Sequence, residues 1–88
     1  MSWFVYVVRC KDNSLYCGIS TEVVRRIRQH NGEIGGGAKC LRGRRPVKLA
    51  WFIQCDTRSV ALKFEAEFKR WPKAKKEQFL VGKTNFGL

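Results

Sequence analysis

Five polar side chains have types and spacings that could do chemistry together: Tyr6, Tyr16, Arg26, His30 and Glu65. A carboxylate can hold a divalent cation, a guanidinium can neutralise a phosphate, and a hydroxyl or an imidazole can accept a proton. Each of the five also has an ordinary structural interpretation. Where each residue falls in the predicted elements helps to decide between its chemical and its structural interpretation.

Glu65 lies four residues after Ala61 and three before Phe68, so it borders the apolar stripe of a predicted helix. A carboxylate near a core is costly unless it is paired or binds a metal. The structural interpretation is a salt bridge at the edge of the core, and the functional one is a metal ligand. Glu67, by contrast, is four residues from Lys63 and is expected in an exposed ion pair.

Arg26 and His30 are four residues apart and therefore project from one face of a predicted helix, with Arg25 and Arg28 on neighbouring faces. On spacing alone this is a solvated basic face. Tyr6 and Tyr16 fall on two predicted strands. They share a face if the intervening loop holds three residues, and a loop of two or four residues would separate them.

Local patterns predict the elements that position these side chains. Residues 3–9 and 15–19 are rich in aromatic and β-branched types and flank the turn-forming residues 11–14, which predicts a β-hairpin. A short helix follows, capped by Ser20 or Thr21, with Val23, Val24 and Ile27 as its apolar stripe and Asn31-Gly32 at its end.

The second half of the chain begins with residues 32–45, which are rich in glycine and basic residues and are expected to form a flexible loop. Residues 47–55 are a third strand candidate. Residues 56–59 supply turn and helix-capping types, and a helical period over residues 60–71 rests on Ala61, Phe64, Phe68 and Trp71. After Pro72, residues 73–80 predict a short helix whose apolar side is Ala74, Phe79 and Leu80.

The first two strands are joined by a tight turn and must be antiparallel. The order ββαβαα therefore predicts an α+β fold with a small three-stranded antiparallel sheet flanked by helices. Eighty-eight residues suffice for one core. We expect a single domain over residues 1–82 and a C-terminal tail over residues 83–88.

As a set, these segments resemble the GIY-YIG nuclease superfamily, and most closely its small stand-alone members. The resemblance covers residues 3 to about 80. It is carried by Phe4-Val5-Tyr6, Tyr16-Cys17-Gly18, the segment from Arg25 to Asn31, the segment from Gly37 to Val47, and the helix with Glu65.

The resemblance implies hydrolysis of phosphodiester bonds with one divalent ion, Mg²⁺ or Mn²⁺. Glu65 would be the metal ligand, Arg26 would hold the scissile phosphate, and Tyr6 and Tyr16 would position or activate the attacking water. His30 stands where the family carries an assisting His or Tyr. Related repair nucleases that cut branched DNA suggest branched or flapped substrates.

Several positions depart from the family pattern. Phe4, Val5 and Cys17 replace the glycine and isoleucines of the two motifs, and Ile19 stands where repair nucleases carry a lysine. The loss of that lysine removes one candidate for activating water. Asn85 is too close to the terminus to match the family's late asparagine.

The chain carries 18 Lys and Arg against 7 Asp and Glu, a formal charge of +11, and 44% of its residues are hydrophobic. A folded basic domain with a polyanionic partner is expected, with nucleic acid, DNA above all, as that partner. The residues expected to contact its phosphates are Arg25, Lys39, Arg42, Arg44, Arg45, Lys73, Lys75 and Lys76.

No run of about 20 apolar residues predicts a membrane span, and no export signal is recognised, so a cytoplasmic protein is expected. The four cysteines lack the spacing of a zinc site. We expect reduced, mostly buried thiols, with a disulfide-stapled or zinc-stabilised domain as a weaker hypothesis.

The leading hypothesis is a divalent-metal-dependent endonuclease. The alternative is a non-catalytic nucleic-acid-binding module, or a subunit whose specificity comes from a protein partner. Glu65 distinguishes them, because binding alone does not require it.

Overall fold

A computed structural model describes residues 2–82. The expected tail over residues 83–88, with Asn85, lies outside the described residues. The observed elements follow the predicted order and are β1 (Trp3–Arg9), β2 (Leu15–Ser20), α1 (Val23–His30), the 3₁₀ helix η1 (Lys39–Arg44), β3 (Lys48–Cys55), α2 (Arg58–Arg70) and α3 (Lys73–Leu80). No helix within these residues has the length and apolar character that a membrane crossing requires.

The three strands form an antiparallel sheet in the order β2-β1-β3, which confirms the predicted α+β fold. β1 is central, with Tyr6 paired to Gly18 of β2 on one side and to Phe52 of β3 on the other. A bulge in β3 leaves Ala50 without an opposite residue, because Val7 pairs with Trp51 and Val8 with Leu49.

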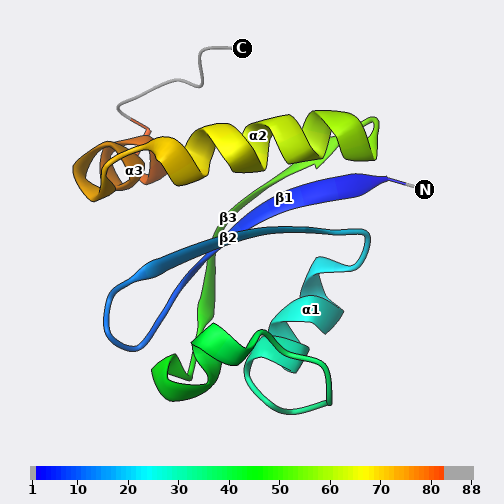
Figure 1. Ribbon diagram of the computed structural model, residues 1–88, viewed down its shortest axis with the longest axis vertical. Helices are drawn as coiled ribbons and strands as arrows, with labels where there is room; N and C mark the ends of the chain where they lie inside the picture. Colours follow the sequence, from blue (N-terminus) through cyan, green and yellow to red (C-terminus); the bar gives the residue numbers. More distant parts are fainter. Residues whose placement is uncertain (1, 83–88) are drawn as a thin grey trace.

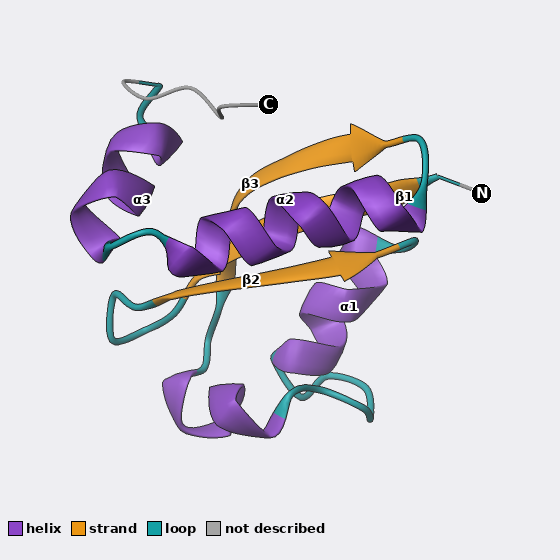
Figure 2. Ribbon diagram, turned by 45° about the horizontal axis from the view of Figure 1, so that its top comes forward, coloured by secondary structure: helices purple, strands orange, loops and turns teal. Residues whose placement is uncertain are grey.

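Helices cover both faces of the sheet (Figures 1 and 2). On one face α2 and α3 pack over Val5, Val7 and Cys17, with Phe68 and Trp71 at the centre of that cluster. On the other face α1 and η1 pack over the alternate β1 residues Tyr6 and Val8. These form a second cluster with Cys10, with Leu41 of η1 and with Val47. Because successive side chains of β1 point to opposite faces, this strand contributes residues to both clusters.

The hairpin connection holds five residues, Cys10 to Ser14, rather than the three considered above. Asn13 takes a positive φ of 70°, and the carboxylate of Asp12 accepts bonds from the backbone N–H and the hydroxyl of Ser14. Loops of five and of three residues both hold an odd number, so both place the same side chains of the two strands on the same face. Tyr6 and Tyr16 consequently lie on the same face of the sheet.

The start of α1 differs from the prediction. Neither Ser20 nor Thr21 is the N-cap; Glu22 occupies that position without a side-chain cap bond, while the Ser20 hydroxyl accepts the N–H of Glu22. The predicted end is confirmed, since Asn31 is the C-cap and Gly32 follows with φ 76°.

Of the other local predictions, some are confirmed and some differ from the structure. Thr57 caps α2 by accepting the N–H of Val60 at 3.1 Å, as the turn residues before that helix indicated. The glycine-rich loop was expected to lack regular structure, but its second part is the helix η1. Val24 and Ala74 were expected on apolar sides and are exposed instead.

Candidate active site

A buried hydrogen-bond chain joins β1, α1 and the loop after α1. The Tyr6 hydroxyl lies 2.7 Å from Nε2 of His30, and the backbone N–H of Ala38 donates to Nδ1 of His30 at 3.2 Å. Because Nδ1 accepts that bond, the proton of the neutral ring is on Nε2, which donates to the Tyr6 oxygen. Tyr6 thereby keeps its own hydroxyl proton available to donate.

His30 is fully buried, and this excludes the solvated basic face that spacing alone suggested. Burial, together with the charges of Arg26 and Arg45, lowers the pKa of His30 to about 4. The ring is therefore neutral at pH 7. In this setting it holds Tyr6 in place rather than presenting a base to solvent.

Tyr6 itself is 1% exposed, and burial raises its pKa to about 12; Tyr16 also raises it, and Arg26 acts in the opposite direction. Gly18, opposite Tyr6 on β2, makes this position possible. A Cβ on Gly18 would lie 2.6 Å from the Tyr6 hydroxyl oxygen, closer than a side-chain carbon and an oxygen in van der Waals contact can approach. The glycine of the second motif thus gives space to the tyrosine of the first.

Tyr16 is half-buried and stands beside the same histidine, with ring centroids 5.3 Å apart in an edge-on arrangement. Burial raises its pKa, Cys40 and Glu65 add to the rise, and Lys69 and Arg26 oppose it. Charged groups from α1 and α2, two helices on opposite faces of the sheet, therefore act on one hydroxyl.

Arg26 projects from α1 toward the glycine-rich loop. Its Nη1 donates to the carbonyl oxygen of Gly36 at 2.7 Å and to the side chain of Gln29 at 2.9 Å. The guanidinium is half-buried and held in one orientation, and it has further N–H groups for an anion. The predicted pair of Arg26 and His30 on one helix face is confirmed in position, but only Arg26 retains contact with solvent.

Glu65 comes from α2, on the face opposite the two tyrosines. Its charge nevertheless raises the pKa values of Tyr16 and Cys17 on β2, an edge strand that α2 also contacts. Its side chain is 20% exposed and lies 3.5 Å from the ammonium of Lys69. The expected salt bridge at the edge of the core is therefore present.

Lys69 was missed at the sequence level. The signal was available, since Lys69 follows Glu65 by four residues, the spacing of helical ion pairs. Glu67 was expected to pair with Lys63, but its carboxylate instead accepts a bond from the indole N–H of Trp71 at 3.3 Å.

The described residues fit one hard cation of low protein coordination. They contain no group of three or more His, Cys, Asp or Glu side chains placed to hold a metal. Mg²⁺ commonly binds through one or two carboxylates and takes its other ligands from water and substrate phosphate. Glu65 is a partly exposed carboxylate, and in this structure it is paired with Lys69.

The basic residues expected at the nucleic acid differ in their surroundings. Lys39, Arg42 and Arg44 are exposed on η1, with Arg44 3.5 Å from Asp12, and Arg25 is exposed on α1. Arg45 is half-buried and donates to the carbonyl oxygen of His30 at 2.6 Å. η1 and α3 lie on opposite faces of the sheet (Figure 1), so their cations form two surfaces.

The three α3 lysines are partly engaged with other groups. Lys73 bonds the carbonyl oxygen of Asn13, and Lys75 and Lys76 lie over the rings of Trp71 and Phe68, at 4.4 and 5.4 Å from their centroids. The four cysteines are all free thiols, three of them buried and Cys40 exposed.

Comparison with known proteins shows the family to which this chain belongs. The sequence profile of the GIY-YIG catalytic domain matches residues 2–78. The chain belongs to the GIY-YIG family. It is 49% identical over 81 residues to a UPF0213 protein of Vibrio cholerae serotype O1, a match that spans 91% of this chain and 78% of the relative. A UPF0213 protein of Haloquadratum walsbyi is 52% identical, over 85% of this chain and 82% of its own.

Two solution NMR structures resemble this GIY-YIG chain. One is a protein of E. faecalis, with 41% identity and a TM-score of 0.63. The other is a UPF0213 protein of Bacillus halodurans, with 36% identity and a TM-score of 0.60. Each match covers 92% of this chain and 84% of the other. The GIY-YIG domain is a nuclease-type catalytic domain, so nucleic acid is the substrate class that the family implies.

Proposed function

We propose that this chain is a divalent-metal-dependent endonuclease that hydrolyses phosphodiester bonds in DNA. The observation that carries the proposal is the meeting of groups from both faces of the sheet at the β2 edge. The charges of Arg26 on α1 and of Glu65 on α2 both act on the pKa of Tyr16 there, Arg26 lowering it and Glu65 raising it. A carboxylate, a held guanidinium and a hydroxyl are the groups that metal-assisted phosphodiester hydrolysis uses.

In this proposal Glu65 holds Mg²⁺ or Mn²⁺, and when bound the ion supplies Lewis-acid stabilisation of charge on the phosphate. Arg26 binds a phosphate oxygen with the N–H groups that Gly36 and Gln29 leave available. Because those two contacts fix the guanidinium before substrate arrives, little order is lost on binding.

The tyrosines position or activate the attacking water. Both have a pKa above the ordinary value of about 10, so both hydroxyls are protonated in the free protein at neutral pH. Tyr6 is oriented by His30, which we assign as a positioning residue, and Tyr16 has the more open position.

The proposed substrate is DNA with branched or flapped structure. Phosphate contacts beyond the scissile group are assigned to cations of α1, η1 and α3, at Arg25, Lys39, Arg42, Arg44, Lys73, Lys75 and Lys76, of which Lys75 and Lys76 are half-buried. Arg45 belongs to this set as well, although its guanidinium also holds α1. A protein partner that supplies specificity, and a cytoplasmic place of action, complete the proposal.

A non-catalytic nucleic-acid-binding module is the second candidate, and two observations favour it. Glu65 is paired with Lys69 in the structure, and Ile19 stands where a lysine activates water in repair nucleases that this chain resembles. A chain that only binds would keep its cations and would not depend on Glu65.

The deciding experiment compares cleavage of labelled branched, duplex and single-stranded DNA, with Mg²⁺ or Mn²⁺, by wild type and Glu65→Gln. We expect cleavage by the wild type and a loss of at least a hundredfold in the variant, because the amide has no charge with which to hold the ion. Glu67→Gln, on the same helix and with an acceptor retained for Trp71, is the matched control.

Equal cleavage by wild type and Glu65→Gln would indicate a contaminating nuclease and remove the assignment of Glu65. Salt-sensitive binding without cleavage by any of the three proteins would favour the binding module.

A further inference from the structure

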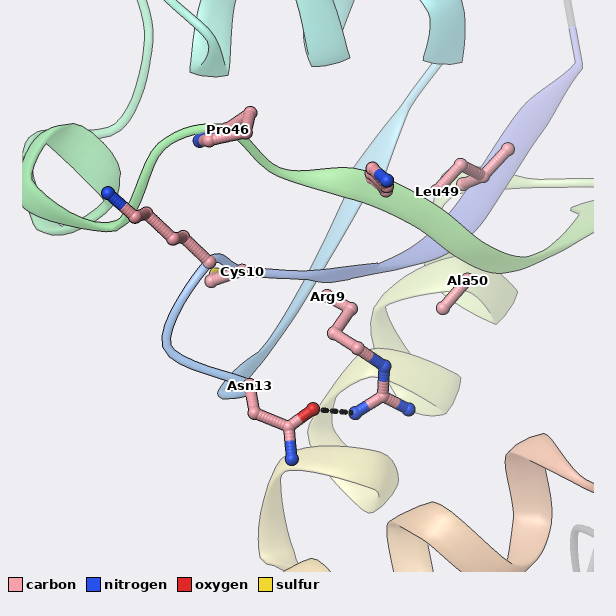
Figure 3. Close-up of a pocket in the computed structure, with 8 residues that line it drawn as sticks. Arg9, Cys10, Asn13, Pro46, Leu49 and Ala50 are labelled. Carbon is pink, nitrogen blue, oxygen red and sulfur yellow. Dashed lines mark hydrogen bonds between the residues drawn. The ribbon is translucent and has the colours of Figure 1, made fainter.

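A pocket lies at the hairpin end of the sheet, between the turn that follows β1 and the start of β3 (Figure 3). Its volume is about 490 Å³, within the range of sites that take small ligands. Three of its lining residues are basic, Arg9, Lys11 and Lys48, and none is acidic within the part of the chain that the structure describes. Lys11 and Lys48 belong neither to the candidate active site nor to the phosphate contacts assigned above.

Two of these cations stand directly opposite each other, because Arg9 of β1 pairs with Lys48 of β3. Residues paired in this way share a face, with Cβ atoms about 5 Å apart, and like charges there destabilise the sheet. Arg9 is neutralised by the two carboxylate oxygens of Glu77, at 2.6 and 2.8 Å. Lys48 is exposed and has no ion pair among residues 2–82. The fold therefore keeps a cation opposite Arg9 without an acid to balance it.

The acids that contact this region already have other cationic partners. Glu77 also lies 3.6 Å from the ammonium of Lys73. Asp12, in the hairpin turn, lies 3.5 Å from the guanidinium of Arg44. Lys11 is exposed, like Lys48, and within the described residues it has no ion pair. The positive charge around the pocket thus exceeds the negative charge, and this attracts an anion.

The uncharged part of the pocket suits the rest of a nucleotide. Pro46, Leu49 and Ala50 give it an apolar side, against which a sugar or a base can pack. The side chain of Asn13 accepts a bond from Arg9 at 2.9 Å, and its Nδ2 has no partner among residues 2–82, so that nitrogen is free to donate. Figure 3 shows Asn13 and Arg9 turned toward each other, with Pro46 and Leu49 along β3 and the segment before it.

We propose that this pocket binds the phosphate of a nucleotide unit, with Lys11 and Lys48 as its charged contacts and Asn13 as a hydrogen-bond donor. Ammonium groups are common phosphate ligands because they act as point charges and do not require one fixed geometry. The nucleotide unit belongs either to a nucleic acid strand or to a free mononucleotide. The substrate class that the family implies favours the strand.

The pocket is separate from the candidate active site. It lies on the β3 side of the central strand β1, whereas Tyr16 stands on β2, on the other side. None of the five candidate site residues lines it. A phosphate held here gives the chain a second point of contact with a nucleic acid. The inference rests on the nucleic acid binding that both candidate functions share, and it does not require cleavage.

Binding of a short labelled DNA duplex to the full chain, followed by fluorescence anisotropy without divalent metal at several salt concentrations, tests the proposal. We expect Lys11→Gln with Lys48→Gln to reduce the magnitude of the salt slope by about 1.8, the value for two phosphate contacts. Lys63→Gln with Arg70→Gln removes the same charge from exposed positions of α2 and is the matched control. Equal slopes for the two double variants would overturn the proposal. Glu65→Gln should bind as the wild type does, so a failure of cleavage is distinguishable from a failure of this site.

NMR titration locates the ligand and separates its two sources. The labelled chain is titrated with thymidine 5′-monophosphate and with a short oligothymidine. Saturable shifts of the amides of residues 9–13 and 47–50, lost in the variant without Lys11 and Lys48, support the site. Binding of the oligomer about tenfold tighter than that of the monophosphate assigns the site to a strand, and equal affinities assign it to a free nucleotide. If neither ligand shifts these amides saturably, the proposal is wrong.

The like charges of Arg9 and Lys48 allow a test by stability. Without phosphate, Lys48→Gln should be at least as stable as the wild type, because the change removes a cation opposite Arg9. Inorganic phosphate, compared with sodium chloride at equal ionic strength, should raise the Tm of the wild type more than that of the variant. A loss of stability in Lys48→Gln without phosphate would give the lysine a structural role and contradict the proposal.

Discussion

A fully buried histidine is an uncommon choice beside a tyrosine, and the structure gives the reason for it here. His30 must accept from Ala38 and donate to Tyr6, and a neutral imidazole does both with its two nitrogens. Two segments distant in sequence are thereby fixed to one ring. The same burial makes the stability of the protein depend on pH.

We predict that the free energy of unfolding falls as the pH is lowered from about 6.5 to about 4. The pKa of His30 is about 4 in the folded chain and near 6.5 when unfolded, so in this window the unfolded state binds the extra proton. The loss is on the order of 3 kcal/mol for this single group. Urea denaturation at intervals of pH measures it.

His30→Gln, which keeps a donor and an acceptor without titrating, is the comparison. It should lack the decline between pH 6.5 and 5. A wild-type chain equally stable at pH 6.5 and pH 4.5 would contradict the assignment.

Gly18 is the second residue whose role is set by one contact. We predict that Gly18→Ala destabilises the chain by about 1 to 3 kcal/mol, because the new methyl group collides with the Tyr6 hydroxyl, which is itself fixed by His30. Chemical denaturation gives the value. Gly35→Ala is the control, since a Cβ there meets nothing within 4 Å, and equal effects of the two substitutions would refute the steric explanation.

At the scale of elements, side-chain hydrogen bonds join the end of α1 to the segment that leads into β3. The side-chain amide of Asn31 accepts the N–H of Val47 at 2.7 Å and donates to the Val47 carbonyl at 3.0 Å, as a neighbouring strand would. Arg45 bonds the carbonyl of His30 in the same region. The end of α1 and the approach to β3 therefore form one unit, and the glycine-rich loop and η1 run between them.

From this we predict that Asn31→Ala lowers the free energy of unfolding by about 1 to 3 kcal/mol, because it leaves both backbone groups of the buried Val47 without their partner. Asn31→Asp keeps the acceptor for the Val47 N–H but places a carboxylate against the Val47 carbonyl. It should therefore still be less stable than the wild type, by part of the amount that Asn31→Ala loses. Thermal and urea denaturation measure both variants. If Asn31→Ala matched the exposed control Gln78→Ala, the amide would not be joining α1 to β3.

At the scale of the whole molecule, the chain carries a charge of +11, and its cations stand on elements of both faces of the sheet, α1 and η1 on one and α2 and α3 on the other. Some of these cations also serve the fold. Arg45 holds α1 and Arg9 holds α3, while Arg42 is exposed on η1 and has no ion pair among the described residues.

We predict that the logarithm of the DNA association constant falls linearly with the logarithm of salt concentration, and that Arg42→Ala reduces the magnitude of this slope by about 0.9, the value for one phosphate contact on duplex DNA. Arg45→Ala should instead lower stability, because it removes the bond to His30. Fluorescence anisotropy at several salt concentrations, paired with denaturation, separates the two effects. An unchanged slope in Arg42→Ala would exclude it from the DNA interface.

The sequence by itself determined the features that depend on near neighbours. The order of the elements, the helical stripe of Ala61 and Phe68, the Thr57 cap and the end of α1 at Asn31-Gly32 all follow from side-chain periodicity and backbone preferences within a few residues. The resemblance to the family suggested the five candidate site residues, and their roles stay a proposal.

Tertiary structure alone decided how those residues meet. Strand order and register depend on closing loops between distant segments and on packing both faces of β1, which no local pattern records. In the order β2-β1-β3 the strand β2 is an edge, and charges from both faces, those of Glu65 and Lys69 on α2 and of Arg26 on α1, act on the pKa of Tyr16. The same order makes β3 the opposite edge, and the packing of α1 against the sheet buries His30 where the helical spacing alone had suggested solvent.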